Sequence, residues 1–202
     1  MKYLIIALLW AGYCALHSYL ISVGFTNAMV KLLKKYYAYY RLFYNLISLV
    51  LIIPLLKYTD HLDSTIIINY GLPLTIVRYI LISASILIFL WAFFIDYDSL
   101  FFFGIRQIIN QNRTKSTESS EGLKKKGLLG IVRHPMYFAL IIYLWCQTFT
   151  LAGIVVNIVL TIYIFVGTWL EEKKLVMELG ETYRKYQEEV PMIIPFTKRR
   201  SL

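Results

Sequence analysis

Two groups of polar residues stand out in the apolar C-terminal half of the chain. Arg133, His134 and Tyr137 occur together in the stretch GIVRHPMYF, where a long apolar run begins. Glu171 and Glu172 follow the end of the next apolar run. Histidine titrates near neutral pH, and an adjacent acidic pair attracts positive charge. We therefore expect these residues to form a site for a cationic ligand.

A short connection between the two apolar runs predicts that these groups meet. The runs cover about residues 136–151 and 153–170, and FTLAG is the only plausible turn between them. Short connections join antiparallel neighbours, and at 1.5 Å per residue each run is about 24–27 Å long. The polar ends of both runs then lie at a similar depth. Pro135 suits the first turn of a helix, which places His134 near its N-cap.

Each of these residues also has a simpler explanation. Arg133 could be a positively charged membrane anchor, and Tyr137 could belong to an interfacial aromatic belt. Lys173 and Lys174 could neutralise the acidic pair in a solvated helix end, although carboxylates are disfavoured at that end of the helix dipole. The cysteines Cys14 and Cys146 lie in apolar runs and have neither disulfide nor metal-ligand spacing, so no metal site is expected.

The composition indicates a membrane protein. The 202 residues are 58% hydrophobic with a mean hydropathy of +0.60, whereas soluble domains are about 45–50% apolar. Apolar runs of about membrane-spanning length cover residues 3–23, 42–56, 74–95, 136–151 and 153–170. We interpret the first run as a retained helix, because it lacks a signal-peptide cleavage site. The sequence predicts an all-α polytopic bundle of about five transmembrane helices.

Loop charges predict the orientation of this bundle. The predicted loops at residues 24–40 and 96–130 are rich in lysine and arginine, whereas the loop at 59–73 has two aspartates and neither basic residue. The positive-inside rule then places the N-terminus outside and the C-terminus in the cytoplasm. The net charge of +9 follows from this rule, and no nucleic-acid-binding motif accompanies it. After residue 170 we expect a cytoplasmic amphipathic helix, interrupted near Gly180.

Other polar residues are expected at the same leaflet, at the ends of the first three predicted spans. Polar and ionisable residues inside a membrane are functional candidates, although packing between helices explains each one equally well. The candidates are His17, Arg41, Asn45 and Arg106.

The stretch GLLGIVRHPMYF, a hydrophobic hairpin and LEEKKLVMELGETYRKYQEEVPMIIP together resemble the integral-membrane methyltransferase superfamily, which includes isoprenylcysteine carboxyl and phospholipid methyltransferases. LHSYLIS, YRLFYN, FGIRQ and TFTLAG resemble the branch that contains methanethiol S-methyltransferases and NnrU-like relatives. The resemblance implies one domain, residues 1–202, that uses S-adenosylmethionine as methyl donor. The cofactor part would cover about residues 121–196, at the cytoplasmic ends of the last two spans.

The resemblance also implies residue roles. Cofactor contacts are expected from Leu129, Arg133, His134, Pro135, Met136, Tyr137, Glu171, Glu172 and Tyr183, preceded by the pocket-lining stretch 121–124. Glu171 would pair with the donor's amino group, and Tyr137 or Trp169 would face its sulfonium. Isoprenylcysteine enzymes have an arginine where this chain has Gly167, and thiol-methylating relatives often have one where Trp169 stands.

The expected reaction is methylation of a small hydrophobic or thiol acceptor, such as methanethiol, to give dimethyl sulfide. The expected acceptor-side residues are His17, Arg41, Asn45 and Arg106. The expected location is the bilayer of a bacterial inner membrane, with the active site facing the cytoplasm and no nucleic-acid partner. A prenylated cysteine carboxylate or a lipid headgroup is the alternative acceptor. A non-catalytic membrane protein that retains the motif is the alternative from another class.

Overall fold

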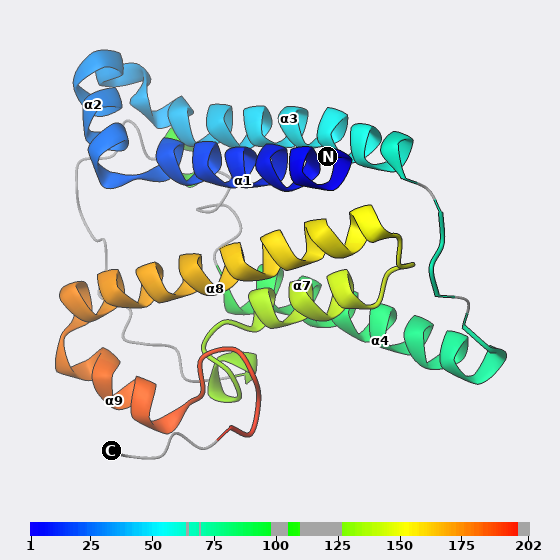
Figure 1. Cartoon of the computed structure of the whole chain (residues 1–202). Helices are drawn as coiled ribbons and strands as arrows, with labels where there is room; N and C mark the ends of the chain where they lie inside the picture. Colours follow the sequence, from blue (N-terminus) through cyan, green and yellow to red (C-terminus); the bar gives the residue numbers. More distant parts are fainter. Residues whose placement is uncertain (64, 69, 98–104, 110–126, 198–202) are drawn as a thin grey trace. The chain divides into compact units, whose positions relative to one another are not determined.

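A computed structural model describes residues 1–63, 65–68, 70–97, 105–109 and 127–197 (Figure 1). The regular structure in these residues is helical, without strands, which confirms the predicted all-α class. The elements are α1 (Lys2–Ile21), α2 (Val23–Leu33), the 3₁₀ helix η1 (Lys34–Tyr39), α3 (Tyr40–Leu62), α4 (Leu72–Trp91), the π-helix η2 (Ala92–Asp96), α6 (Ile105–Ile109), η4 (Gly127–Gly130), α7 (Pro135–Trp145), α8 (Leu151–Leu179) and α9 (Glu181–Glu189).

The chain forms two compact units. The first unit includes Met1–Ile68 and Thr148–Leu160, and the second includes Asn69–Asp98, Ser119–Gln147 and Thr161–Leu202. Helix α8 therefore contributes its beginning to the first unit and the rest to the second. The short helix α6 belongs to the first unit.

In the first unit, α1 lies beside α3 (Figure 1). Trp10 is buried, and its indole N–H donates a hydrogen bond of 3.0 Å to the hydroxyl of Thr59. Ile6 and Trp10 also form an apolar core with Ala152 and Val156 from the start of α8. A buried tryptophan needs a partner for its single polar group, and Thr59 provides it on the neighbouring helix.

The loop predicted at residues 24–40 is wrong, because that segment is helical. Ser22 is the N-cap of α2, and its hydroxyl accepts a hydrogen bond of 3.3 Å from the backbone N–H of Phe25. Capping by serine satisfies a backbone donor that would otherwise lack a partner, and this favours a helix start. Lys34, with a φ of 48°, ends α2 before η1 continues. The positive charges of this segment therefore lie on helices.

In the second unit, α7 lies beside α4 (Figure 1). Helix α7 has 11 residues and ends at Trp145, earlier than the expected apolar run. At 1.5 Å per residue it is about 16 Å long, less than the roughly 30 Å of a bilayer's hydrocarbon core. The connection to α8 is consequently residues 146–150. It overlaps the predicted turn FTLAG only at Phe149 and Thr150, so the predicted bounds of the turn are wrong. The Thr150 hydroxyl accepts from the Gly153 N–H at 2.9 Å, which favours the start of α8 at Leu151.

Four helical segments of the described chain are long and apolar enough to cross a membrane, and α7 is a shorter apolar helix. The four are Lys2–Ile21, Val23–Leu62, Leu72–Asp96 and Leu151–Leu179. Large apolar side chains on them are exposed, among them Leu8 at 63%, Leu49 at 60% and Leu87 at 67%. Water disfavours such extensive apolar surface, whereas lipid accommodates it.

Helix α8 continues without a break past the expected membrane boundary at residue 170. It ends at Leu179, where Gly180 adopts φ 58° and ψ −132°. This backbone conformation is nearly restricted to glycine, so the predicted interruption at Gly180 is confirmed. Beyond it, Tyr183 and Tyr186 of α9 pack with Val190 and with apolar side chains of α8.

Candidate functional site

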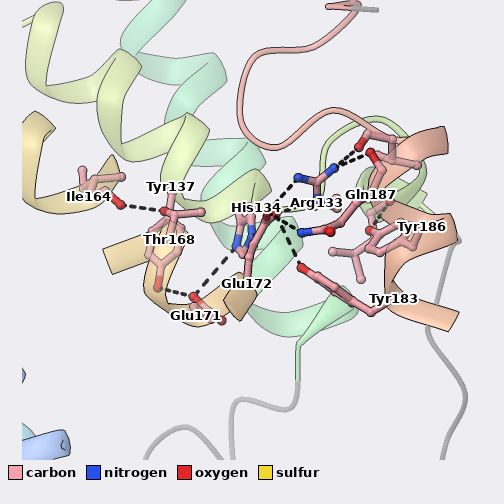
Figure 2. Close-up of polar contacts among 12 residues, drawn as sticks. Arg133, His134, Tyr137, Ile164, Thr168, Glu171, Glu172, Tyr183, Tyr186 and Gln187 are labelled. Carbon is pink, nitrogen blue, oxygen red and sulfur yellow. Dashed lines mark hydrogen bonds and ion pairs between the residues drawn. The ribbon is translucent and has the colours of Figure 1, made fainter. Parts of the chain in front are cut away.

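Arg133 is the centre of a buried polar network in the second unit (Figure 2). Its Nε donates to Glu172 Oε1 at 2.6 Å, and its Nη2 donates to Glu172 Oε2 at 2.9 Å. Its Nη1 donates to the carbonyls of Gln187 and Val190. The backbone N–H of Arg133 donates to the carbonyl of Pro191 at 2.9 Å. Arg133 therefore connects α8 to α9 and to the chain that follows, and it is not an exposed membrane anchor.

Glu172 receives hydrogen bonds from several elements at once (Figure 2). Besides Arg133, its Oε1 lies 3.2 Å from His134 Nε2 and accepts from the Tyr183 hydroxyl at 3.5 Å. Its Oε2 accepts from the Gln187 side-chain amide at 2.9 Å. A bidentate guanidinium and these further donors compensate for burying the carboxylate.

His134 stands at the N-cap of α7, and Pro135 occupies the first turn, as predicted. The backbone N–H of His134 donates to the carbonyl of Met192 at 3.1 Å, so the chain after α9 holds this position. Its ring stacks on Tyr137, with the centroids 5.6 Å apart and the planes at 18°. These contacts fix the imidazole in one orientation between Glu171 and Glu172.

Glu171 is more open than its neighbour, with 42% of its side chain exposed. Its Oε2 accepts from the Tyr137 hydroxyl at 3.1 Å and lies 3.9 Å from His134 Nδ1 (Figure 2). We call Glu171, Tyr137 and the Nδ1 side of His134 the open edge. The predicted convergence of the start of α7 with the polar end of α8 is confirmed.

Three tyrosines near these residues have raised pKa values, of which Tyr183 and Tyr186 are buried and Tyr97 is partly buried. Burial raises the pKa of Tyr97, and the nearby charge of Glu171 raises it further. Burial likewise raises the pKa of Tyr183, and it raises that of Tyr186 to about 12. The Tyr186 hydroxyl donates to the carbonyl of Leu129 at 2.6 Å. At neutral pH these phenols are therefore protonated. Sequence analysis missed Tyr97, whose only indication was an aromatic residue at the end of an apolar run.

The remaining expected cofactor positions have varied surroundings. Pro135 is buried, whereas Leu129 and Met136 are partly buried. The stretch 121–124 lies outside the described residues. The Lys173 ammonium lies over the ring of Trp169, 3.5 Å from its centroid. A second cation on that ring face would be repelled, which disfavours Trp169 as the ring facing a sulfonium.

The residues expected on the acceptor side belong to the first unit. His17 Nδ1 lies 3.0 Å from the Ser48 hydroxyl, and its ring stacks on Tyr13. Arg41 and Asn45 lie one turn apart on α3, and Arg106 is on α6. His17 is thus held by α3, the helix that also carries Arg41 and Asn45.

The chain is similar to curated methanethiol S-methyltransferases, which confirms the resemblance indicated by the motifs. It is 37% identical over 110 residues to the enzyme of a Pseudomonas species, a match that covers 54% of this chain and 41% of that one. The enzyme of Pseudomonas deceptionensis is 38% identical over 115 residues, with 56% and 42% covered. Methanethiol S-methyltransferase 1 of Bradyrhizobium diazoefficiens is 37% identical over 118 residues, with 58% and 40% covered.

The match spans less than half the length of each of these relatives. No protein-family model and no solved structure matches the chain.

Proposed function

We propose that this chain is an S-adenosylmethionine-dependent methyltransferase that methylates a small thiol, such as methanethiol, to dimethyl sulfide. The observation that carries the proposal is the open edge, where the half-exposed carboxylate of Glu171, the Tyr137 phenol and His134 Nδ1 meet. This edge lies beside the buried ion pair of Arg133 and Glu172. The similarity to methanethiol S-methyltransferases supports this choice of reaction.

The residues at the open edge fit the methyl donor chemically. S-adenosylmethionine supplies, when bound, a methyl group on a positively charged sulfur. Glu171 keeps acceptor capacity beyond its single bond from Tyr137, so it can bind the primary ammonium group of the donor. Tyr137 holds that carboxylate in place by donating to it. Pro135 and Met136 are the neighbouring positions expected to enclose the cofactor.

On the acceptor side, a thiol must lose its proton before its sulfur takes up a methyl group, because the thiolate is the nucleophile. His17 is the candidate to hold this proton, since imidazole titrates near neutral pH and the Ser48 hydroxyl orients its ring. Arg41, Asn45 and Arg106 remain acceptor-side candidates. The proposed role of these four residues is based on their positions in the sequence and on the resemblance.

We place the protein in the bacterial inner membrane, with the N-terminus outside and the site facing the cytoplasm, as one catalytic domain whose cofactor part covers about residues 121–196. The apolar surface of the four long helices supports insertion into lipid. A small apolar thiol partitions into such a bilayer. The lysines and arginines of residues 24–40 and 96–130, and the two aspartates of residues 59–73, support the orientation.

Glu171→Gln tests the proposal with a matched control. Losing the charged hydrogen bond to a ligand ammonium costs about 1.5–3 kcal/mol, so S-adenosylhomocysteine should bind about 10- to 100-fold more weakly. Dimethyl sulfide formation at limiting donor should fall similarly. Glu178→Gln, on the same helix and paired only with exposed Lys174 at 3.5 Å, should change neither. Wild-type behaviour of Glu171→Gln would contradict the assignment.

A further inference from the structure

Glu171 and Glu172 are neighbours in sequence with opposite surroundings. The side chain of Glu172 is 9% exposed, whereas that of Glu171 is 42% exposed. A carboxylate offers about four lone-pair sites. Those of Glu172 already face the donors of Arg133, His134, Tyr183 and Gln187 at 2.6–3.5 Å. Glu172 therefore has no capacity left for a ligand, although its position beside Glu171 suggests a shared role.

The contact with Glu172 decides which ring nitrogen of His134 carries a proton. The bidentate pair with Arg133 keeps Glu172 ionised, so both of its oxygens only accept hydrogen bonds. His134 Nε2, at 3.2 Å from one of them, must then be the N–H donor. In the neutral imidazole the other nitrogen, Nδ1, is left as an acceptor. Nδ1 is the atom that faces Glu171 on the open edge, where the His134 side chain is 4% exposed and that of Glu171 is 42% exposed.

Two acceptors thus face each other on the open edge. His134 Nδ1 and Glu171 Oε2 are 3.9 Å apart, and neither has a proton to give the other when the imidazole is neutral. A single group with several N–H donors satisfies both. A primary ammonium has three such donors. The distance and the chemistry of the two acceptors therefore fit one ammonium between them.

We propose that Arg133 and Glu172 are positioning residues that hold His134 in its Nε2–H tautomer, and that His134 Nδ1 and Glu171 together bind the primary ammonium group of the methyl donor. The proposal rests on the function proposed above. It divides the adjacent glutamates between two tasks. Glu171 contacts the ligand, and Glu172 acts only through the imidazole.

The first test uses the unaltered full-length protein in detergent micelles. Nitrogen-15 NMR of labelled histidines distinguishes a protonated ring nitrogen from an unprotonated one. The chain has three histidines, and His17→Ala and His61→Ala identify the signals of the other two. We expect His134 to carry its proton on Nε2 at a pH where the ring is neutral. A proton on Nδ1 would overturn the proposal.

The second test measures binding of S-adenosylhomocysteine and of an analogue in which hydrogen replaces the amino group. The wild type should bind the analogue about 10-fold or more weakly, because a charged hydrogen-bond partner is lost. In Glu172→Gln one carboxylate oxygen becomes an NH2 group. With the remaining oxygen accepting from Arg133 Nη2 and Gln187, that NH2 faces His134 Nε2, so the His134 tautomer should change. This variant should lose most of the preference for the amino group, whereas Glu178→Gln should keep it.

The outcomes separate this inference from the proposed function. A wild type that fails to bind S-adenosylhomocysteine overturns the proposed function and this inference with it. A wild type that binds both ligands equally, or whose His134 is protonated on Nδ1, overturns this inference alone. If Glu172→Gln does not fold, the NMR and ligand comparisons on the wild type still decide.

Discussion

Replacing Arg133 by methionine should be among the most destabilising single changes in the second unit. The variant removes two of the donors to Glu172, at 2.6 and 2.9 Å, and the donor to the carbonyls of Gln187 in α9 and of Val190 at its C-cap. Arg133 and Glu172 are 6% and 7% exposed, so water cannot replace the lost guanidinium. Removing one partner of a buried ion pair costs about 3–5 kcal/mol. We expect a loss of this size in the free energy of unfolding.

Reversible unfolding in mixed micelles measures this loss. Three further variants, Lys174→Met, Glu172→Met and the double variant Arg133→Met/Glu172→Met, serve to interpret it. Lys174→Met breaks only an exposed pair at 3.5 Å and should cost less than about 1 kcal/mol. The double variant Arg133→Met/Glu172→Met removes both charges and should cost much less than the sum of its single variants. A loss below about 1 kcal/mol for Arg133→Met, or additive single effects, would refute the account of the network.

Three further predictions follow from local geometry. Gly180→Ala should destabilise by about 1–3 kcal/mol because of its backbone conformation, whereas Gly167→Ala, in the helix and with open space around it, should be neutral or stabilising by up to about 1 kcal/mol in the same unfolding assay. The pKa of Tyr186 is raised to about 12, so the folded state keeps a proton that the unfolded state loses first. The contribution of this phenol to stability is therefore complete below about pH 10 and is lost towards pH 12. Tyr186→Phe should flatten that part of a pH–stability curve. His17→Ala should reduce turnover of methanethiol without changing S-adenosylhomocysteine affinity, and unchanged turnover would remove His17 from the acceptor side.

The sequence was enough to predict that the segment with Arg133 and His134 meets the glutamate pair. It was not enough to predict the different roles of Glu171 and Glu172. A short connection between apolar runs is enough to bring Arg133 and His134 near the end of α8. Adjacent residues on a helix point about 100° apart, so the sequence cannot tell which glutamate faces α9. That depends on Gln187 and Val190, whose carbonyls receive Arg133 only after the chain turns at Gly180.

For the helices, the sequence likewise predicted some features correctly and others wrongly. Apolar composition predicted the long helices, because burial in lipid needs only sufficient length and hydrophobicity. It failed at residues 24–40, where low hydrophobicity suggested a loop but the cap at Ser22 starts a helix. It failed again at α7, which ends at Trp145 although the apolar run continues to about residue 151. The first error comes from a capping hydrogen bond that average hydropathy does not register.

Acceptor competition tests the central claim most directly. Purified protein would receive methyl-labelled S-adenosylmethionine together with equal concentrations of methanethiol and a prenylated cysteine, and the label would be followed in both products. The account predicts label in volatile dimethyl sulfide, and a loss of that label in Glu171→Gln but not in Glu178→Gln. Label found mainly in the prenylcysteine methyl ester, or in neither product, would contradict it.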